Sequence, residues 1–147
     1  MSYAAGGAMS QQPKGTRVHG AGAIQVKTYV PKPYDEPRDG PKLVRINVTE
    51  AFSGDVEGEG TAEFLQLLRP DGSATFVGLE RVVGTVGGRS GSFVLQDAGA
   101  LEGDTVSGTW FVVPGSGTGE LRGLRGEGGF TAKLGQNAKI TLDYWFE

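Results

Sequence analysis

The stretch between residues 60 and 113 decides the fold of this chain. It holds four runs separated by short turns, GTAEFLQLLR (60–69), ATFVGLERVVGTV (74–86), GSFVLQDA (91–98) and TVSGTWFVV (105–113). The runs are rich in β-branched and aromatic residues, and none follows a helical hydrophobic period over a useful length. Strands that follow one another through short turns predict an antiparallel meander.

Working outward, apolar runs of the same kind fill the chain from Gly20 to Glu147. A meander of this length has to protect its edge strands, and closure into a barrel removes the edges altogether. We therefore expect an all-β fold, an eight-stranded antiparallel meander β-barrel, over residues 17–147. The longest helical piece should fall within 117–124.

Two segments differ from this pattern. Residues 1–16 (MSYAAGGAMSQQPKGT) are small and polar without periodicity, which is typical of a disordered tail. Residues 30–42 (VPKPYDEPRDGPK) contain four prolines among alternating charges, which predicts a long ordered loop between the first two strands.

Composition narrows the function classes. The 147 residues are typical of one domain. The chain contains no cysteine, which excludes a disulfide or a thiolate site. Its net charge of −3 does not favour a nucleic-acid partner. His19 is the only histidine, which excludes a histidine triad and a multi-histidine metal centre. No phosphate-binding loop, apolar leader or membrane-length apolar run is present, so we expect a cytoplasmic protein without metal or nucleotide cofactor, acting away from membranes.

Turn chemistry predicts the strand register. Arg69-Pro70-Asp71-Gly72 suits a type I turn with a glycine bulge, which places Phe64 opposite Gly78 and Ala62 opposite Glu80. The next turn is centred on Gly87-Gly88 and places Glu80 opposite Leu95.

These registers sort the side chains onto two faces. We assign to the lumen the face with three phenylalanines and with glycine gaps at Gly78, Gly84 and Gly91 that leave room beside large residues; it carries Phe64, Gln66, Phe76, Glu80, Val82, Phe93 and Leu95. The other face carries Leu65, Val77, Leu79, Val83 and Val94, which is too apolar for the surface of a monomer. We therefore expect a homo-oligomer.

Glu80 is the candidate catalytic residue. Its neighbours on the lumen face are apolar, so its carboxyl should be desolvated and its pKa raised, as a general acid or base near neutral pH requires. Gln66, Tyr144 or a donor from the strand at 42–52 should be its partner, and Glu50 either joins it as a second inward acid or lies at the rim. The alternative is a structural glutamate that is paired within the wall.

Two further aromatic residues complete the candidate ligand-binding set with Phe64, Gln66, Phe76, Phe93 and Leu95. Trp110 meets Leu95 if the intervening turn uses Glu102-Gly103, and is either core or a ligand platform. The ring of Tyr144 shares a face with Ile140, Leu142 and Phe146, so its hydroxyl needs a partner, which the cavity can supply.

Four blocks carry a family resemblance: FSGDVEGEGTAEF (52–64), FVGLERVVGTVGGRSGSFVLQ (76–96), VVPGSGTGELRGLRGEGGF (112–130) and TLDYWFE (141–147). Together they resemble the bacterial family called domain of unknown function 3224, over roughly residues 22–147. The GSGTGELRGLRG segment is also similar to a turn of plant allene oxide cyclases and dirigent proteins. The resemblance implies an allene oxide cyclase-like barrel whose relatives hold an apolar substrate in the lumen without a metal or nucleotide.

Three functional hypotheses remain open. The first is a barrel that binds a small hydrophobic ligand and acts as a cofactor-free isomerase or cyclase through Glu80. The second is a non-catalytic, lipocalin-like binding barrel. The third is a purely structural barrel with a packed interior, which the volume of the lumen would distinguish from the other two.

Overall fold

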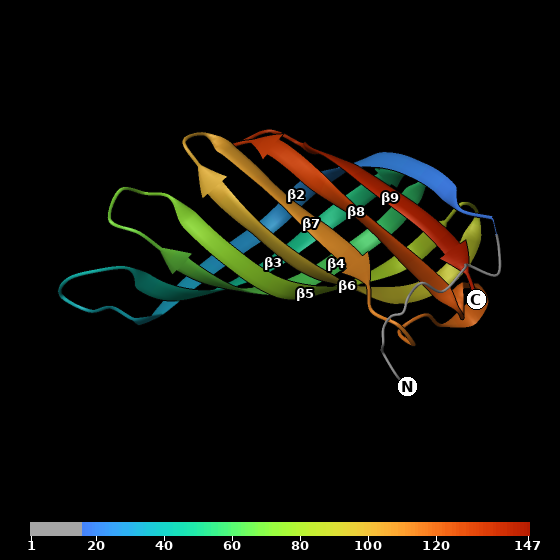
Figure 1. Ribbon diagram of the computed structural model, residues 1–147, viewed down its shortest axis with the longest axis horizontal. Coiled ribbons are helices and arrows are strands. Elements are labelled where there is room, and N and C mark those ends of the chain that lie inside the picture. Colours follow the sequence, from blue (N-terminus) through green and yellow to red (C-terminus); the bar gives the residue numbers. More distant parts are fainter. Residues whose placement is uncertain (1–15) are drawn as a thin grey trace.

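The eight expected strands form a closed antiparallel barrel in meander order (Figure 1). The structure, a computed structural model, describes residues 16–147, so the predicted tail at 1–16 lies outside the described residues except for Thr16. The strands are β2 (Val18–Asp35), β3 (Lys42–Gly54), β4 (Val56–Leu68), β5 (Ala74–Val86), β6 (Arg89–Glu102), β7 (Thr105–Val112), β8 (Leu124–Lys133) and β9 (Ala138–Phe146). β2 pairs with both β3 and β9, which closes the barrel.

The predicted registers are confirmed because the turns form as their residues require. Gly72 has a φ of 90°, and Arg69 N donates to Ser73 O at 2.9 Å across the turn. Phe64 pairs with Gly78 and Ala62 with Glu80. Gly87 and Gly88 both have positive φ, which a two-residue hairpin of this type needs, and Glu80 then pairs with Leu95.

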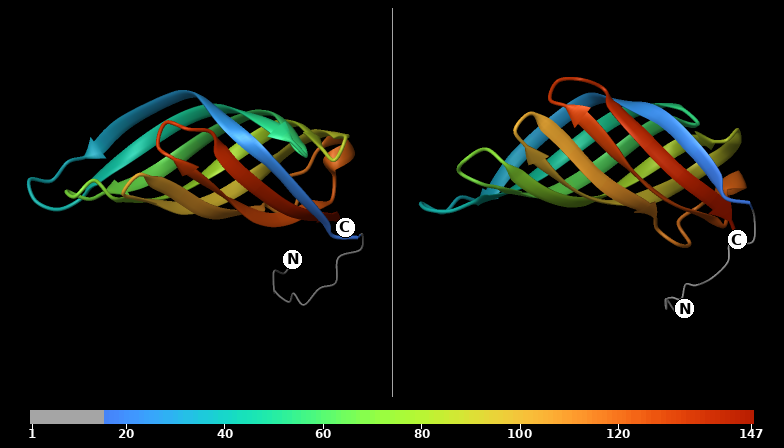
Figure 2. Two further views of the ribbon diagram at one scale, coloured as in Figure 1. Left: turned by 90° about the horizontal axis from the view of Figure 1, so that it is seen from above. Right: turned by 45° about the horizontal axis from the view of Figure 1, so that its top comes forward.

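The expected long loop at 30–42 is wrong. β2 continues to Asp35 and β3 begins at Lys42, so only residues 36–41 connect them. Two of the prolines, Pro31 and Pro33, lie within β2. The wall tolerates them because β2 pairs with β9 only as far as Ile24, so one edge of β2 is unpaired beyond it and needs no N–H donor. The resulting hairpin reaches beyond the other turns (Figure 2).

The two ends of the barrel differ. The plugged end holds the turns at Gly54-Asp55 and Gly87-Gly88 and the connection between β7 and β8. That connection contains the short 3₁₀ helix η2 (Gly119–Leu121), inside the expected range 117–124, and its Leu121 is fully buried. The open end holds the other turns, at 36–41, 69–73, 103–104 and 134–137.

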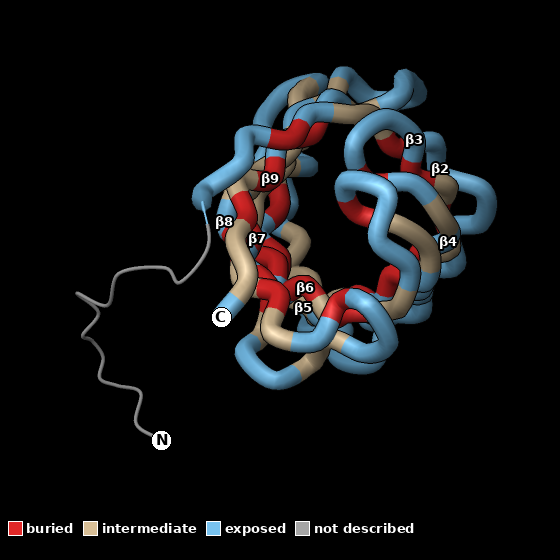
Figure 3. Tube along the Cα trace, turned by 90° about the vertical axis from the view of Figure 1, so that its right-hand side faces the viewer, coloured by how far each residue is buried: buried red, intermediate tan, exposed pale blue. Residues whose placement is uncertain are grey.

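Most of the core lies in the plugged half of the lumen. Leu121 belongs there to one cluster of buried side chains that includes Phe93, Val86 and Leu124. Viewed from the side of the termini, buried residues alternate with more exposed ones along the wall (Figure 3). Within residues 16–147, no helix is long and apolar enough to cross a membrane.

Candidate functional site

Three carboxyl side chains lie inside the barrel: Glu50 on β3, Glu80 on β5 and Asp97 on β6, with exposed fractions of 7%, 1% and 3%. Their register explains how they meet. Glu50 pairs with Gly60 of β4, and Gly60 pairs with Val82 of β5. Glu80 is two residues before Val82 on β5, so it lies on the same face but closer to the open end. Asp97 lies one further repeat in the same direction, since Glu80 pairs with Leu95. Strands tilt in a closed barrel, so this diagonal brings the three acids together; we call them the acid cluster.

Gly60 leaves the space that the acid cluster needs. It lies between Glu50 and Val82 on the inner wall and is buried. A methyl group there would overlap Glu80 Oε2 and would lie 2.8 Å from the ring of Phe52. The carboxyl of Glu80 therefore occupies the position that a side chain on β4 would otherwise fill.

The acid cluster has no counter-charge among residues 16–147. No lysine or arginine in this range is buried, and none of the ion pairs of this range includes Glu50, Glu80 or Asp97. Oδ1 of Asp97 is buried without a hydrogen-bond partner in this part of the chain, and the only group in contact with the buried oxygens of Glu80 that can form a hydrogen bond is the carboxyl of Glu50. The described acids also do not form a group arranged to hold a metal ion.

Burial and mutual repulsion keep protons on this cluster. Burial raises the pKa of Glu80 far above its ordinary value, and hydrogen bonding to Glu50 and the charges of Glu50 and Asp97 raise it further. Burial, with a smaller contribution from the charge of Glu50, raises the pKa of Asp97 to about 7. Two ionised carboxylates cannot donate to each other, but a proton on Glu80 turns its contact with Glu50 into a hydrogen bond. The cluster thus combines a neutral acid with a group that titrates near neutral pH, which is the pairing that acid–base chemistry uses.

A row of aromatic rings runs through the lumen beside the acids; we call it the aromatic row. Successive ring centroids are 5.5 Å apart for Phe64–Phe76, 6.2 Å for Phe76–Phe130, 5.1 Å for Phe130–Trp110 and 6.2 Å for Trp110–Phe52. At the open end Phe64 and Phe130 are only half-buried, whereas Trp110 is 4% exposed and pairs directly with Asp97.

The glycine gaps of the lumen are filled, which corrects the expectation that they leave room. The ring of Phe64 lies against Gly78, and Leu121 and Thr118 of the β7–β8 connection lie against Gly91. At Gly84 the backbone of β4 comes equally close. The absence of a side chain at these positions is what lets rings and neighbouring backbone pack closely.

The structure separates the predicted ligand-binding residues into groups. Phe93 and Leu95 are fully buried in the core, while Phe64, Gln66 and Phe76 lie towards the open end. Tyr144 lies at the plugged end, where its hydroxyl faces Gly87, and it makes no hydrogen bond with Glu80.

Trp110 does not meet Leu95, because the hairpin does not use the turn at Glu102-Gly103 on which that pairing depended. The hairpin turns at Gly103-Asp104, so Trp110 pairs with Asp97 and Val112 takes the place opposite Leu95. The partner of Glu80 is Glu50, which lies inside the wall and not at its rim.

Asp97 is the site residue that the sequence interpretation missed. The signal was present, because Phe93, Leu95 and Asp97 alternate along one face of β6. An aspartate near the end of an apolar run is typical of a turn, whereas β6 continues to Glu102.

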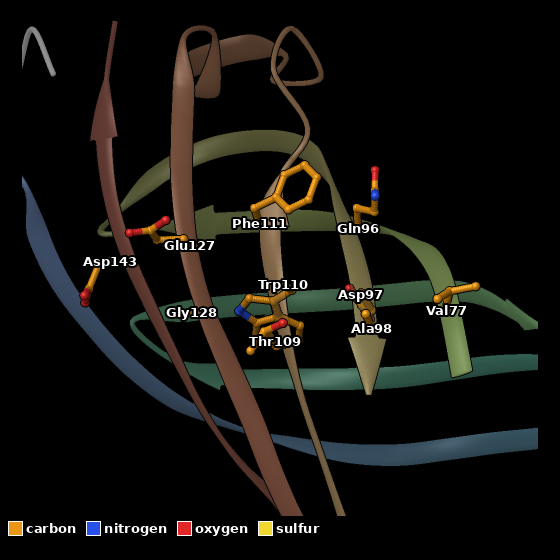
Figure 4. A pocket seen from close by; sticks show the side chains of 10 residues that line it. All are labelled: Val77, Gln96, Asp97, Ala98, Thr109, Trp110, Phe111, Glu127, Gly128 and Asp143. Atoms are coloured by element: carbon orange, nitrogen blue, oxygen red, sulfur yellow. The ribbon is translucent and has the colours of Figure 1, made fainter. Parts of the chain in front are cut away.

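Neither of the two pockets described for this chain is lined by Glu50 or Glu80. The larger, about 520 Å³, is a groove on the outer wall of β5 to β9, where Gln96 of β6 and Phe111 of β7 pair in register and project on the same side (Figure 4). Its floor includes Asp97, Trp110 and Gly128, whose neighbours in sequence point outward. The smaller, about 250 Å³, lies at the plugged end between Arg89, Tyr144 and Phe146.

The comparisons with known proteins agree with this architecture. The family model described as a protein of unknown function (DUF3224) matches residues 20–144. A crystal structure of a protein of unknown function from the DUF3224 family of Shewanella oneidensis MR-1 is 32% identical. It matches with a TM-score of 0.73, over 90% of this chain and 99% of that one. No curated protein matches. The chain belongs to the DUF3224 family.

Proposed function

We propose that this barrel binds a small, largely apolar molecule in its lumen, and that the acid cluster handles the polar group of that molecule. The observation that carries the proposal is that no donor of the described chain reaches the buried Oδ1 of Asp97, while the buried carboxyl of Glu80 contacts only the carboxyl of Glu50. Buried polar groups are almost always hydrogen-bonded, and an unpartnered acid weakens the fold. A ligand that supplies the missing partner accounts for their presence.

The open end is the route to this site. Phe64 and Phe130 are half-buried there, so their rings can turn outward without dismantling the core. The plugged end has no such freedom, since Leu121 and Leu124 are fully enclosed. Because the ligand-free lumen is packed by these rings, binding requires the aromatic row to open rather than a preformed cavity to be filled.

The chemistry that this cluster supports is proton transfer without a cofactor. A protonated Glu80 donates a proton to the bound molecule while a carboxylate of the cluster removes another, so atoms and charge balance within one isomerisation or cyclisation. The carboxyl that received a proton from the bound molecule then passes a proton to Glu80, which restores the starting state of the cluster.

A neutral lipophilic dye tests ligand binding. N-phenyl-1-naphthylamine should gain fluorescence in the presence of the protein. Phe64→Ala should change the affinity of the protein for this dye, because the ring of Phe64 lies at the open end of the lumen. Leu65→Ala is the matched control, since Leu65 is the next residue on β4 and points outward. Native mass spectrometry of the purified chain should show a bound small molecule. A dye that does not bind, or that responds equally to both variants, would favour the purely structural barrel.

A further inference from the structure

At the level of the acid cluster, residues 16–147 supply acceptors to the lumen but no free donor. The indole N–H of Trp110, which pairs with Asp97, already donates to Thr141 O at 3.0 Å. The hydroxyl of Tyr144 lies at the plugged end, and Gln66 lies near the open end. A hydrogen-bond donor for Oδ1 of Asp97 must therefore come from outside the described part of the wall.

The charge of the lumen points the same way. Three carboxyls share it, and none of the basic side chains between residues 16 and 147 is buried. An anionic ligand would add repulsion in a region of low dielectric, whereas a cation would offset the charge that forms when a carboxyl ionises. The cluster thus selects on the charge of its ligand and not only on its shape.

The aromatic row supplies the second half of a cation site. Trp110 is the side chain opposite Asp97, and Phe52 and Phe130 lie 6.2 and 5.1 Å from it between ring centroids. The faces of aromatic rings, those of tryptophan above all, attract ammonium groups, and the attraction grows when the site is desolvated. Carboxylates beside rings therefore match a molecule with a cationic head and an apolar body.

We propose that the ligand of this lumen is a lipophilic amine in its protonated form, with its ammonium group donating to Asp97 and its apolar body lying along the aromatic row. This inference rests on the proposed function and names the chemical class of the ligand. The N–H groups of a primary or secondary ammonium provide the donors that the wall lacks. Glu80 keeps its proton towards Glu50, while Asp97 ionises as the amine binds.

Three matched probes test the ligand class by isothermal titration calorimetry at pH 7: 2-phenylethylamine, 2-phenylethanol and 3-phenylpropanoate. The amine should bind roughly 10- to 100-fold more tightly than the alcohol, and the propanoate more weakly than either. Because Asp97 titrates at about 7, binding of the amine at pH 6 should release protons, seen as a dependence of the heat on the buffer.

Variants locate the effect. Asp97→Asn should abolish the preference for the amine over the alcohol. Glu127→Gln removes the same charge from an outer-wall side chain that is 63% exposed, so it should change neither affinity.

If the alcohol or the propanoate binds as tightly as the amine, or if Asp97→Asn has no effect, the ammonium assignment is wrong. If the naphthylamine dye binds and distinguishes Phe64→Ala from Leu65→Ala, but none of the three probes binds, the ligand class is wrong and the lumen site stands. If neither the dye nor any probe binds, both proposals fail.

Discussion

Asp97→Asn should stabilise the protein, and more so at high pH. In the folded state the pKa of Asp97 is about 7 because its carboxyl is buried, against an ordinary value of 3.8. The folded form therefore holds a proton that the unfolded form has already lost, so the contribution of Asp97 to stability decreases as pH rises from about 4 to about 7, and then levels off. Asparagine resembles the protonated carboxyl in shape and in donor capacity, and it does not titrate.

The magnitude follows from the difference between the two pKa values. One pKa unit corresponds to about 1.4 kcal/mol, so the full difference amounts to about 4 kcal/mol. At pH 5 Asp97 is already ionised in the unfolded state. Raising the pH from 5 to 9 should therefore lower the free energy of unfolding of the natural protein by about 2–3 kcal/mol, most of it below pH 7. The free energy of unfolding of Asp97→Asn should therefore exceed that of the natural protein by about 2–3 kcal/mol more at pH 9 than at pH 5.

Urea denaturation at pH 5, 7 and 9 measures this difference. Glu127→Gln is the control, because Glu127 lies on the outer wall, where an acid is solvated. Free energies of unfolding of the natural protein and Asp97→Asn that run parallel from pH 5 to pH 9 would refute the reasoning. They would mean that Asp97 ionises inside the barrel without cost.

Four further predictions concern the same wall. Glu50→Gln should lower the pKa of Asp97 below about 7, as measured by NMR titration of its carboxyl carbon, because the charge of Glu50 raises that pKa; an unchanged titration would contradict the cluster. Glu80→Gln should keep the free energy of unfolding within about 1 kcal/mol at pH 7, since the amide donates to Glu50 as the protonated acid does; a larger loss in urea would mean that Glu80 is ionised. Gly60→Ala should cost roughly 1–3 kcal/mol in the same assay, because its methyl group overlaps Glu80; no loss would mean that the wall yields freely. We propose that the outer face around Leu79, which is 54% exposed, contacts a second copy; Leu79→Glu should then reduce the mass in light scattering to one chain, and a natural protein already at 15.4 kDa would contradict this.

The barrel and its register were predictable because they depend on local signals. The turns at Pro70-Asp71-Gly72 and Gly87-Gly88 allow few strand alignments, and alternation along β5 then places Glu80 inside. The same logic predicted the short helical turn near Leu121. Each of these features needs only neighbouring residues and a hairpin between them.

The acid cluster was only partly predictable. Its members come from β3, β5 and β6, and their meeting depends on strand tilt, which no hairpin signal specifies. Aspartate is common in turns, so the residue type alone did not place Asp97 in a strand. Only the length of β6 shows that Asp97 lies within the strand, on its inward face. Likewise, the prolines of β2 suggested a loop, because only the structure shows that β2 extends beyond its pairing with β9 and has an unpaired edge there.

By itself, the sequence determined the class of fold, the order of the strands, and which face of the central strands is apolar. Turn residues and side-chain alternation act over a few residues, so they are present in any sequence that folds this way. Only the tertiary structure decided that Glu50 approaches Glu80 and that Asp97 lies near enough to share their charge. These contacts depend on how far each strand is displaced along its neighbours when the barrel closes. That displacement belongs to the whole sheet and to no single segment.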